Sequence, residues 1–118
     1  MKCPGHCCGE LKLKDACGVF GIYSFSDDNL AKPTYYGLYA LQHRGQESAG
    51  IYVTDGQKFE GRVGMGLVNV VFTEENLKNL HGNISIGHVR YSTTGSSVVE
   101  NAQPFVVESK FGPLAIAH

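Results

Sequence analysis

Six short segments follow one another after residue 16 and limit what this chain can fold into. They span residues 17–25, 49–54, 57–63, 84–90, 105–109 and 114–117. Five are rich in apolar and β-branched residues, and the other, residues 57–63, is the expected hairpin partner of 49–54. Runs of this length and composition are typical of β-strands. Because several of the connections are short, neighbouring strands are expected to pair as antiparallel hairpins. Together with two helical segments, the pattern predicts an α+β fold with an antiparallel sheet.

The first helix is predicted for residues 33–42. Pro33 suits the first helical turn, where its missing N–H needs no partner. The apolar side chains then recur at spacings of three and four, which places them on one face. They are Tyr35, Leu38, Tyr39 and Leu41. Gly45 follows at a position that is typical of a helix stop.

The second helix is predicted for residues 74–81. Thr73 is expected to cap its first turn, with Phe72 and Leu77 at the two positions of a hydrophobic staple. Asn76 stands where a capping box has Glu or Gln. No capping box is therefore expected at this helix.

Three turns are expected between the predicted strands. Asp55-Gly56 is expected to form a type I′ turn, in which both central residues take positive φ angles. The glycine-rich stretch 61–66 matches neither the dinucleotide nor the phosphate-loop spacing, so it is interpreted as a hairpin connection. Residues 110–113 are expected to form the loop between the last two strands.

The composition narrows the class of protein. The chain has 118 residues, of which 42% are hydrophobic and 18% charged, so one globular domain is expected rather than a disordered chain. No apolar run approaches the length of a membrane span. Ten basic and eleven acidic residues give a formal charge of −1, which predicts no basic face for nucleic acid. Neither a membrane nor nucleic acid is expected as a partner.

The four cysteines of the chain all lie within its first 17 residues. They are Cys3, Cys7, Cys8 and Cys17. A disulfide framework would spread its cysteines along the chain, and no apolar run of secretory length precedes Cys17. A reducing, cytoplasmic setting is therefore expected. Residues 1–16 show neither a helical nor a strand period and are interpreted as a leader ahead of one domain, residues 17–118.

Metal binding by this leader is one alternative to catalysis. Cys3, His6, Cys7 and Cys8 carry atoms that bind zinc and other soft metals. Two of them are adjacent, however, and no second pair lies downstream at the distance found in zinc fingers. No metal site is assigned, and a non-enzymatic metal or thiol module stays open as an alternative.

Cys17 is the first candidate for catalysis. It begins the first predicted strand, and Gly18 follows it without a side chain to block approach. The commoner role of such a cysteine is simply to pack in the core. A nucleophilic cysteine needs a base and an oxyanion site. Its own α-amine would serve as that base, as in N-terminal threonine nucleophiles, once residues 1–16 had been removed.

Two polar segments lie at the ends of predicted strands. Arg90 leads from a strand into a Ser/Thr/Gly loop, where a guanidinium can hold a carboxylate through two parallel hydrogen bonds. Residues 42–50 (QHRGQESAG) are densely polar and follow the first helix. Taken singly, the two are more often an ordinary surface arginine beside a polar turn and a solvated helix end.

The order of five motifs changes this interpretation. They are CGVFGI from Cys17, LQHRGQESAGI from Leu41, GHVRY from Gly87, NAQPF from Asn101 and LAIAH from Leu114. Together they resemble the class II glutamine amidotransferase domain over residues 17–118. The segments QHRGQESAG and GHVRYSTTG favour the members that serve purine synthesis. The alternatives within the class are the members that serve glucosamine-phosphate or asparagine synthesis.

The resemblance implies an N-terminal nucleophile hydrolase fold. This is a four-layer αββα sandwich of antiparallel sheets, of which the chain would form the N-terminal portion. Residues 1–16 would correspond to a propeptide. Cys17 would be the nucleophile that attacks the side-chain amide of glutamine, with its freed α-amine as proton shuttle. The γ-glutamyl thioester would then be hydrolysed to glutamate.

The resemblance also implies a glutamine-binding set. Arg90 corresponds to the arginine that holds the α-carboxylate of glutamine, and Arg44 to an arginine near the nucleophile. Tyr91, Ser92 and Thr93 lie where the family surrounds the substrate. His88 is expected to support that loop.

Partners and cofactors follow from the same resemblance. In the complete enzyme, ammonia would pass to phosphoribosyl pyrophosphate in a second domain that uses magnesium, giving 5-phosphoribosylamine. No cofactor is expected in this segment, and the presence of an iron–sulfur cluster is left open. A homo-oligomer is expected for the full-length form.

The chain ends at His118 in an apolar strand and is expected to be a fragment. The family continues there with an Asn-Gly pair that forms the oxyanion hole, and losing one oxyanion donor costs about 10²–10³ in rate. The 118 residues alone are therefore expected to lack glutaminase activity. A further alternative is an unprocessed relative that serves only as a scaffold.

Overall fold

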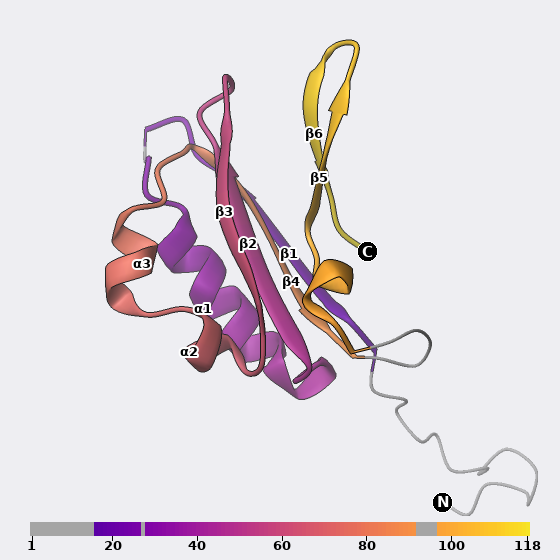
Figure 1. The fold of residues 1–118 in the computed structure, drawn as a ribbon. Coiled ribbons are helices and arrows are strands. Elements are labelled where there is room, and N and C mark those ends of the chain that lie inside the picture. Colours follow the sequence, from indigo (N-terminus) through magenta and orange to yellow (C-terminus); the bar gives the residue numbers. More distant parts are fainter. Residues whose placement is uncertain (1–15, 27, 92–96) are drawn as a thin grey trace, which may run out of the picture.

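The computed structural model describes residues 16–26, 28–91 and 97–118 (Figure 1). Four strands form an antiparallel sheet in the order β1-β4-β2-β3, and two more form a separate hairpin. The strands are β1 (Gly18–Tyr23), β2 (Ser48–Thr54), β3 (Phe59–Met65), β4 (Ile84–Arg90), β5 (Phe105–Ser109) and β6 (Gly112–Ile116). The helices are α1 (Ala31–Leu41), α2 (Val68–Val71) and α3 (Glu74–Lys78), with the 3₁₀ turns η1 (Gln42–Arg44) and η2 (Val99–Asn101).

The elements form three layers. Figure 1 shows α1, α2 and α3 on one side of the four-stranded sheet and the β5–β6 hairpin on its other side. This arrangement confirms the predicted α+β class with antiparallel sheet. It is also what one helical layer and two sheet layers of an αββα sandwich would look like.

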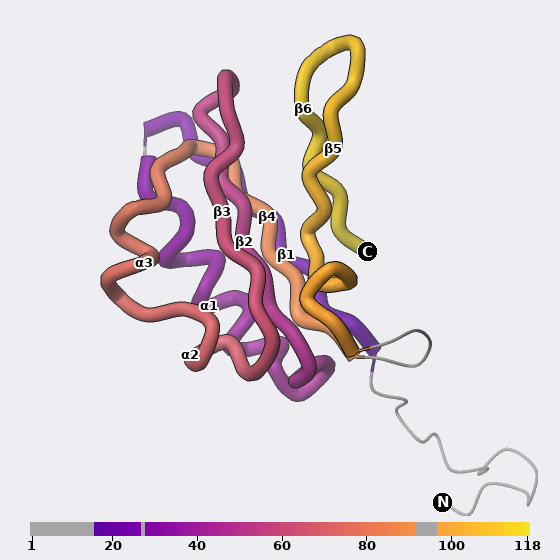
Figure 2. The backbone as a smooth tube through the Cα atoms, in the orientation of Figure 1, coloured from indigo at the N-terminus to yellow at the C-terminus, as the bar shows by residue number. Residues whose placement is uncertain are grey.

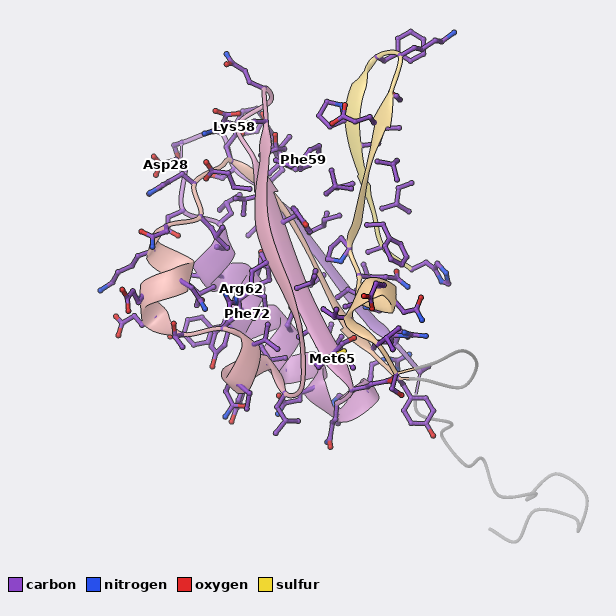
Figure 3. All side chains as sticks on the ribbon, viewed as in Figure 1. Asp28, Lys58, Phe59, Arg62, Met65 and Phe72 are labelled. Atoms are coloured by element: carbon purple, nitrogen blue, oxygen red, sulfur yellow. The ribbon has the colours of Figure 1, made fainter. Side chains whose placement is uncertain are left out.

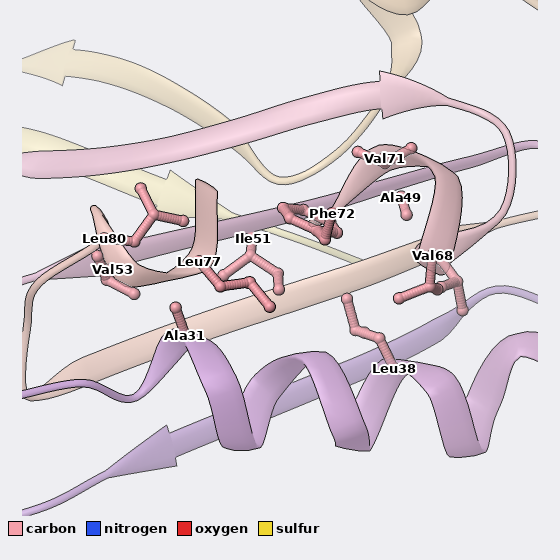
Figure 4. Close-up of a cluster of buried hydrophobic side chains, with 11 residues drawn as sticks. Ala31, Leu38, Ala49, Ile51, Val53, Val68, Val71, Phe72, Leu77 and Leu80 are labelled. Atoms are coloured by element: carbon pink, nitrogen blue, oxygen red, sulfur yellow. The ribbon is translucent and has the colours of Figure 1, made fainter. Parts of the chain in front are cut away.

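The hydrophobic core lies between the sheet and the helices (Figure 4). Side chains alternate along a strand, so Ala49, Ile51 and Val53 of β2 all face the helical layer and are buried. They pack with Leu38 of α1 and with Phe72, which follows α2. Full burial of one such large side chain stabilises a fold by roughly 1.5–3 kcal/mol. The opposite face of the same strands is left for other contacts.

Strand β4 lies between β1 and β2 and sets the register of both. Gly18 of β1 pairs with Val89, and Ser48 of β2 pairs with Arg90. The start of β1 and the end of β4 therefore lie side by side, as the backbone tube also shows (Figure 2). This places the residue before β1 next to the residues that leave β4.

The first helix begins earlier than predicted, at Ala31 rather than Pro33. Pro33 still lies in the first turn, where it needs no N–H partner. Gly45 does not end the α-helix directly, because η1 intervenes, and its φ of −167° is extended backbone. The reason for a glycine at this position is therefore not a left-handed helix stop.

The second predicted helix is shorter than expected, and a further short helix precedes it. Helix α3 ends at Lys78, and the sequence pattern did not predict α2. Thr73 caps α3 as predicted, since its side chain accepts from the N–H of Asn76. The prediction that no capping box forms is wrong, because the Asn76 side chain accepts the N–H of Thr73 at 2.9 Å. Asparagine carries the same amide oxygen as glutamine, and here it reaches the backbone.

Two turns also differ from the predictions. Gly56 has a φ of +95°, but within the described residues no non-glycine has a positive φ, so Asp55-Gly56 is not a type I′ turn. The Asp55 carboxylate instead accepts the N–H groups of Gln57 and Lys58 at 2.9 and 3.2 Å. This longer turn delays the start of β3, which then includes most of the stretch that was interpreted as a connection.

The last hairpin is tighter than predicted. Strand β5 covers the predicted residues, whereas β6 begins at Gly112, so only Lys110 and Phe111 form the turn. The Ser109 hydroxyl donates to the carbonyl of Gly112 at 2.7 Å and accepts the N–H of Phe111 at 3.1 Å. These two side-chain bonds close the turn within fewer residues.

A membrane-spanning helix is not found in the part of the chain that the structure describes, because its helices are too short and too polar.

Candidate active site around Cys17

The candidate site lies at the end of the sheet where β3 finishes, which Met65 marks in Figure 3. Met65 pairs with Ser48, and Ser48 pairs in turn with Arg90. Cys17 directly precedes β1 and reaches the same end. Lys58 and Phe59, also labelled in Figure 3, mark the opposite end of β3.

The Cys17 thiol lies against the main chain of Tyr91. Its sulfur is 3.4 Å from the Tyr91 nitrogen, which donates to it, and 3.6 Å from the Tyr91 carbonyl oxygen, to which the thiol can donate. The thiol is a free cysteine and is only partly buried. A neutral thiol satisfies both contacts, while a thiolate would keep the N–H donor. The first strand begins one residue later than predicted, at Gly18, so Cys17 directly precedes it.

Arg44 holds the main chain of the same residue. It is the last residue of η1, and its Nε donates to the Cys17 carbonyl oxygen at 3.2 Å. The 3₁₀ turn after α1 therefore delivers an arginine to the residue before β1, 27 positions away in the sequence. Arg44 acts on the backbone of Cys17 rather than on its sulfur.

Arg90 is the last residue of β4 and is partly buried. Its Nη1 donates to the carbonyl oxygen of Asn101 at 3.3 Å. A guanidinium carries five N–H donors in a rigid fork, enough to hold this carbonyl and a carboxylate as well. Tyr91 follows it at the surface, while Ser92 and Thr93 lie outside the described residues.

The main chain of Arg90 is enclosed by the segment that precedes β2. Glu47 donates its N–H to the Arg90 carbonyl oxygen at 3.2 Å. A methyl group on Gly45 would lie 2.5 Å from the carbonyl carbon of Arg90 and 2.7 Å from its oxygen. Glycine is therefore required at position 45 because the backbone of Arg90 approaches it closely. The sequence pattern had instead predicted a helix stop at this residue.

His88 is buried completely, on the face of β4 that is turned away from the helices. Its Nε2 lies 2.7 Å from the backbone oxygen of His118, while its Nδ1 is buried and has no hydrogen-bond partner. The predicted role for His88 was to support the loop after β4, and that loop lies largely outside the described residues. The contact with His118 was not predicted.

The burial of His88 has a consequence for stability at acid pH. Burial lowers the pKa of the His88 imidazole, because the charged form loses its hydration, while its bond to the backbone oxygen of His118 acts in the opposite direction. The unfolded chain then binds a proton at a higher pH than the folded one. We expect the free energy of unfolding to fall as the pH drops below about 6.5, the ordinary pKa of histidine.

Urea unfolding of the chain between about pH 7.5 and pH 5 checks this expectation. His88→Gln, which cannot titrate, should lose less stability than the parent over this range. The control is His43→Gln, because His43 is exposed and its Nδ1 contacts the nearby carbonyl oxygen of Ala40. Equal pH dependence of the parent and His88→Gln would contradict the expectation.

The leader and its cysteines lie outside the described residues, apart from Ala16. Nothing in the structure bears on Cys3, His6, Cys7 or Cys8. Among the described residues, no group of three or more His, Cys, Asp or Glu side chains is arranged to hold a metal ion.

Two solved structures share this fold. One is the glutamine phosphoribosylpyrophosphate amidotransferase from B. subtilis complexed with ADP and GMP, with a TM-score of 0.72 and 46% identity over 84% of this chain and 21% of that one. The other is described as the allosteric regulatory enzyme of purine biosynthesis, with a TM-score of 0.73 and 47% identity over 82% of this chain and 21% of that one. The fold is thus part of an N-terminal nucleophile hydrolase.

Curated relatives narrow the class to one family. The amidophosphoribosyltransferase of Methanocaldococcus jannaschii is 62% identical over 102 residues, which are 86% of this chain and 22% of the relative. The Homo sapiens amidophosphoribosyltransferase is 51% identical over 117 aligned residues, 92% of this chain and 23% of the relative. No family model matches the chain. The chain belongs to the amidophosphoribosyltransferase family and spans about a fifth of the length of these relatives.

Proposed function

We propose that this chain supplies the nucleophile and part of the glutamine site of an amidophosphoribosyltransferase, with Cys17 as the nucleophile. The observation that carries the proposal is the position of the Cys17 sulfur against the Tyr91 main chain, one residue from Arg90. A thiol and a guanidinium at the same sheet end suit a substrate that has both an electrophilic carbonyl and a carboxylate. Glutamine has both.

The proposed reaction has two steps. The Cys17 sulfur forms a bond to the side-chain amide carbon of glutamine, and the carbon–nitrogen bond breaks. The thiol proton passes through the α-amine of Cys17 to the leaving nitrogen, which departs as ammonia. Water then attacks the thioester carbon, the carbon–sulfur bond breaks, and glutamate leaves with the thiol restored.

Five further residues have proposed roles in the glutamine site. Arg90 would hold the α-carboxylate of glutamine through paired hydrogen bonds, which its planar fork favours. Tyr91, with Ser92 and Thr93 after it, would surround the substrate. Arg44 would position the nucleophile through the Cys17 carbonyl, to which it donates at 3.2 Å.

The use of the α-amine requires cleavage between Ala16 and Cys17. We propose that residues 1–16 are a leader and residues 17–118 the glutaminase portion. Ammonia would pass to phosphoribosyl pyrophosphate in parts of the polypeptide beyond this segment, where magnesium would act, in a cytoplasmic homo-oligomer. The 118 residues alone would not turn over glutamine.

The test is the intact mass of the protein after exposure to an electrophilic glutamine analogue. The chain is carried in a chimaera in which it replaces the matching segment of the M. jannaschii relative, so that the rest of the relatives' length is supplied. We expect loss of residues 1–16 and a single adduct that maps to Cys17.

Two variants make the result specific. Cys17→Ala should take no adduct, and Cys8→Ala should leave the yield of adduct unchanged. An intact leader without an adduct would contradict the proposal and favour a scaffold role. An adduct on the leader cysteines instead would favour the thiol or metal module.

A further inference from the structure

The two sheet layers are joined by polar contacts from the face of β4 that is turned away from the helices. On this face, Arg90 donates to the carbonyl of Asn101, and His88 contacts the backbone oxygen of His118 at 2.7 Å. Both acceptors belong to main chain that flanks the β5–β6 hairpin: Asn101 in η2, before it, and His118 after it. A single strand therefore holds this main chain at two points, two residues apart along β4.

The main chain of His118 is held on both sides. Its N–H donates to the Oε1 of Gln103 at 2.9 Å, and its oxygen lies against the Nε2 of His88. A backbone oxygen only accepts, so Nε2 must carry the hydrogen of the imidazole. Nδ1 is then an acceptor, and it is buried without a partner. Only one neutral tautomer of His88 can therefore make this contact.

Gln103 is itself fixed by the sheet. It is 8% exposed, and its carbonyl oxygen packs so closely on Gly50 of β2 that a methyl group there would overlap it. Gly50 pairs directly with His88. His88, on β4, and Gln103, whose backbone packs on Gly50 of β2, thus hold His118 at the same level of the sheet.

We propose that His88 and Gln103 act as positioning residues that fix the main chain at His118 relative to the Cys17 thiol. The thiol and the main chain at His118 are both attached to β4, the thiol through Tyr91 and His118 through His88. The spacing of the two is therefore set by a paired strand rather than by a loop. The catalytic part of this inference rests on the proposed function.

The first experiment measures hydrogen exchange of the His118 amide by NMR in the 118-residue chain. His88→Leu and Gln103→Leu should each speed this exchange at least tenfold. His88→Gln, which keeps an N–H donor, and Gln103→Glu, which keeps an acceptor oxygen, should largely restore protection. The amides of Ile51 and Val53 in the core report, in the same spectra, whether each variant is folded.

The second experiment measures glutamine turnover in the chimaera. His88→Leu should lower kcat by about tenfold or more with little change in KM, because main chain displaced relative to the thiol affects the reaction more than substrate binding. His88→Gln should recover most of kcat. The matched control is His43→Leu, since His43 also contacts a backbone carbonyl but is exposed.

Each outcome decides one part. If the His118 amide exchanges as fast in the parent as in the two leucine variants, while the core amides stay protected, His88 and Gln103 do not hold the main chain at His118. If kcat of His88→Leu equals that of the parent, the contact between His88 and His118 has no role in catalysis. If the parent takes no adduct at Cys17 but its His118 amide behaves as expected, the proposed function is contradicted. The structural role of His88 and Gln103 at His118 is then still supported.

Discussion

Replacement of Gly50 by alanine should destabilise the chain by about 3 kcal/mol, at the upper end of what overpacking costs. The added methyl group would overlap the carbonyl oxygen of Gln103 and lie 2.6 Å from Cγ1 of Val63. One obstacle is backbone of the second layer and the other is a side chain of the adjacent strand. The Gln103 backbone cannot move without shifting the chain before β5 away from β2. Urea unfolding of the variant and the parent measures the loss.

Gly21→Ala is the matched control for this substitution. Gly21 also lies inside a strand of the same sheet, but an added methyl group would meet its nearest atom, the carbonyl oxygen of Ser85, at an ordinary 3.9 Å. Removing a glycine from the unfolded ensemble favours folding slightly where the native backbone allows it. We therefore expect little change or a small gain. Equal losses in the two variants would show that the contact with Gln103 is not what requires glycine at position 50.

Replacement of Gly45 by alanine should instead leave a folded chain with a damaged site. The new methyl group would lie within 2.9 Å of three backbone atoms of Arg90. Arg90 would have to move, and Tyr91, which contacts the Cys17 sulfur, would move with it. A displacement of about 1 Å in a catalytic constellation can cost 10²-fold in rate. We expect glutamine turnover in the chimaera, and the rate of adduct formation at Cys17, to fall by about that factor.

The comparison with Gly50→Ala separates the two effects. Gly45 lies at the rim of the sheet, outside the buried cluster, so its substitution should reduce the free energy of unfolding less. Gly21→Ala again serves as the control and should keep full turnover. Normal adduct formation in Gly45→Ala would mean that Arg90 and Cys17 tolerate the displacement, contrary to the proposed geometry.

The sequence predicted the strands better than the segments that join them. Strands β4 and β5 have the predicted bounds because alternation and β-branched residues determine them locally. The turn at Asp55 was wrong because a side-chain oxygen, not two positive φ angles, closes it. Helix α2 was not expected because its four residues, VNVV, are as compatible with a strand as with a helix.

The candidate site was predicted in part. Cys17 and Arg90 stand out by their motifs. The structure places Cys17 beside Tyr91, the residue that follows Arg90. The bonds from Arg44 to Cys17 and from Gln103 to His118 join residues that are 27 and 15 positions apart. No local pattern specifies such pairs, because they depend on how the strands are ordered in the sheet. Gly45 and Gly50 show the same limit, since the atoms that exclude a side chain there come from Arg90 and Gln103.

The position of Cys17 just outside β1 bears on the order of maturation events. The first paired residue of the strand is Gly18, and Ala16 is exposed. Among the described residues, cleavage of the bond between Ala16 and Cys17 would therefore break no pairing of the sheet. The contacts that hold Cys17, from the N–H of Tyr91 to its sulfur and from Arg44 to its carbonyl, are in place only after β1 has docked on β4. Under the proposed function, we expect the sheet to assemble before the leader is removed, because only the paired sheet holds Cys17 in place.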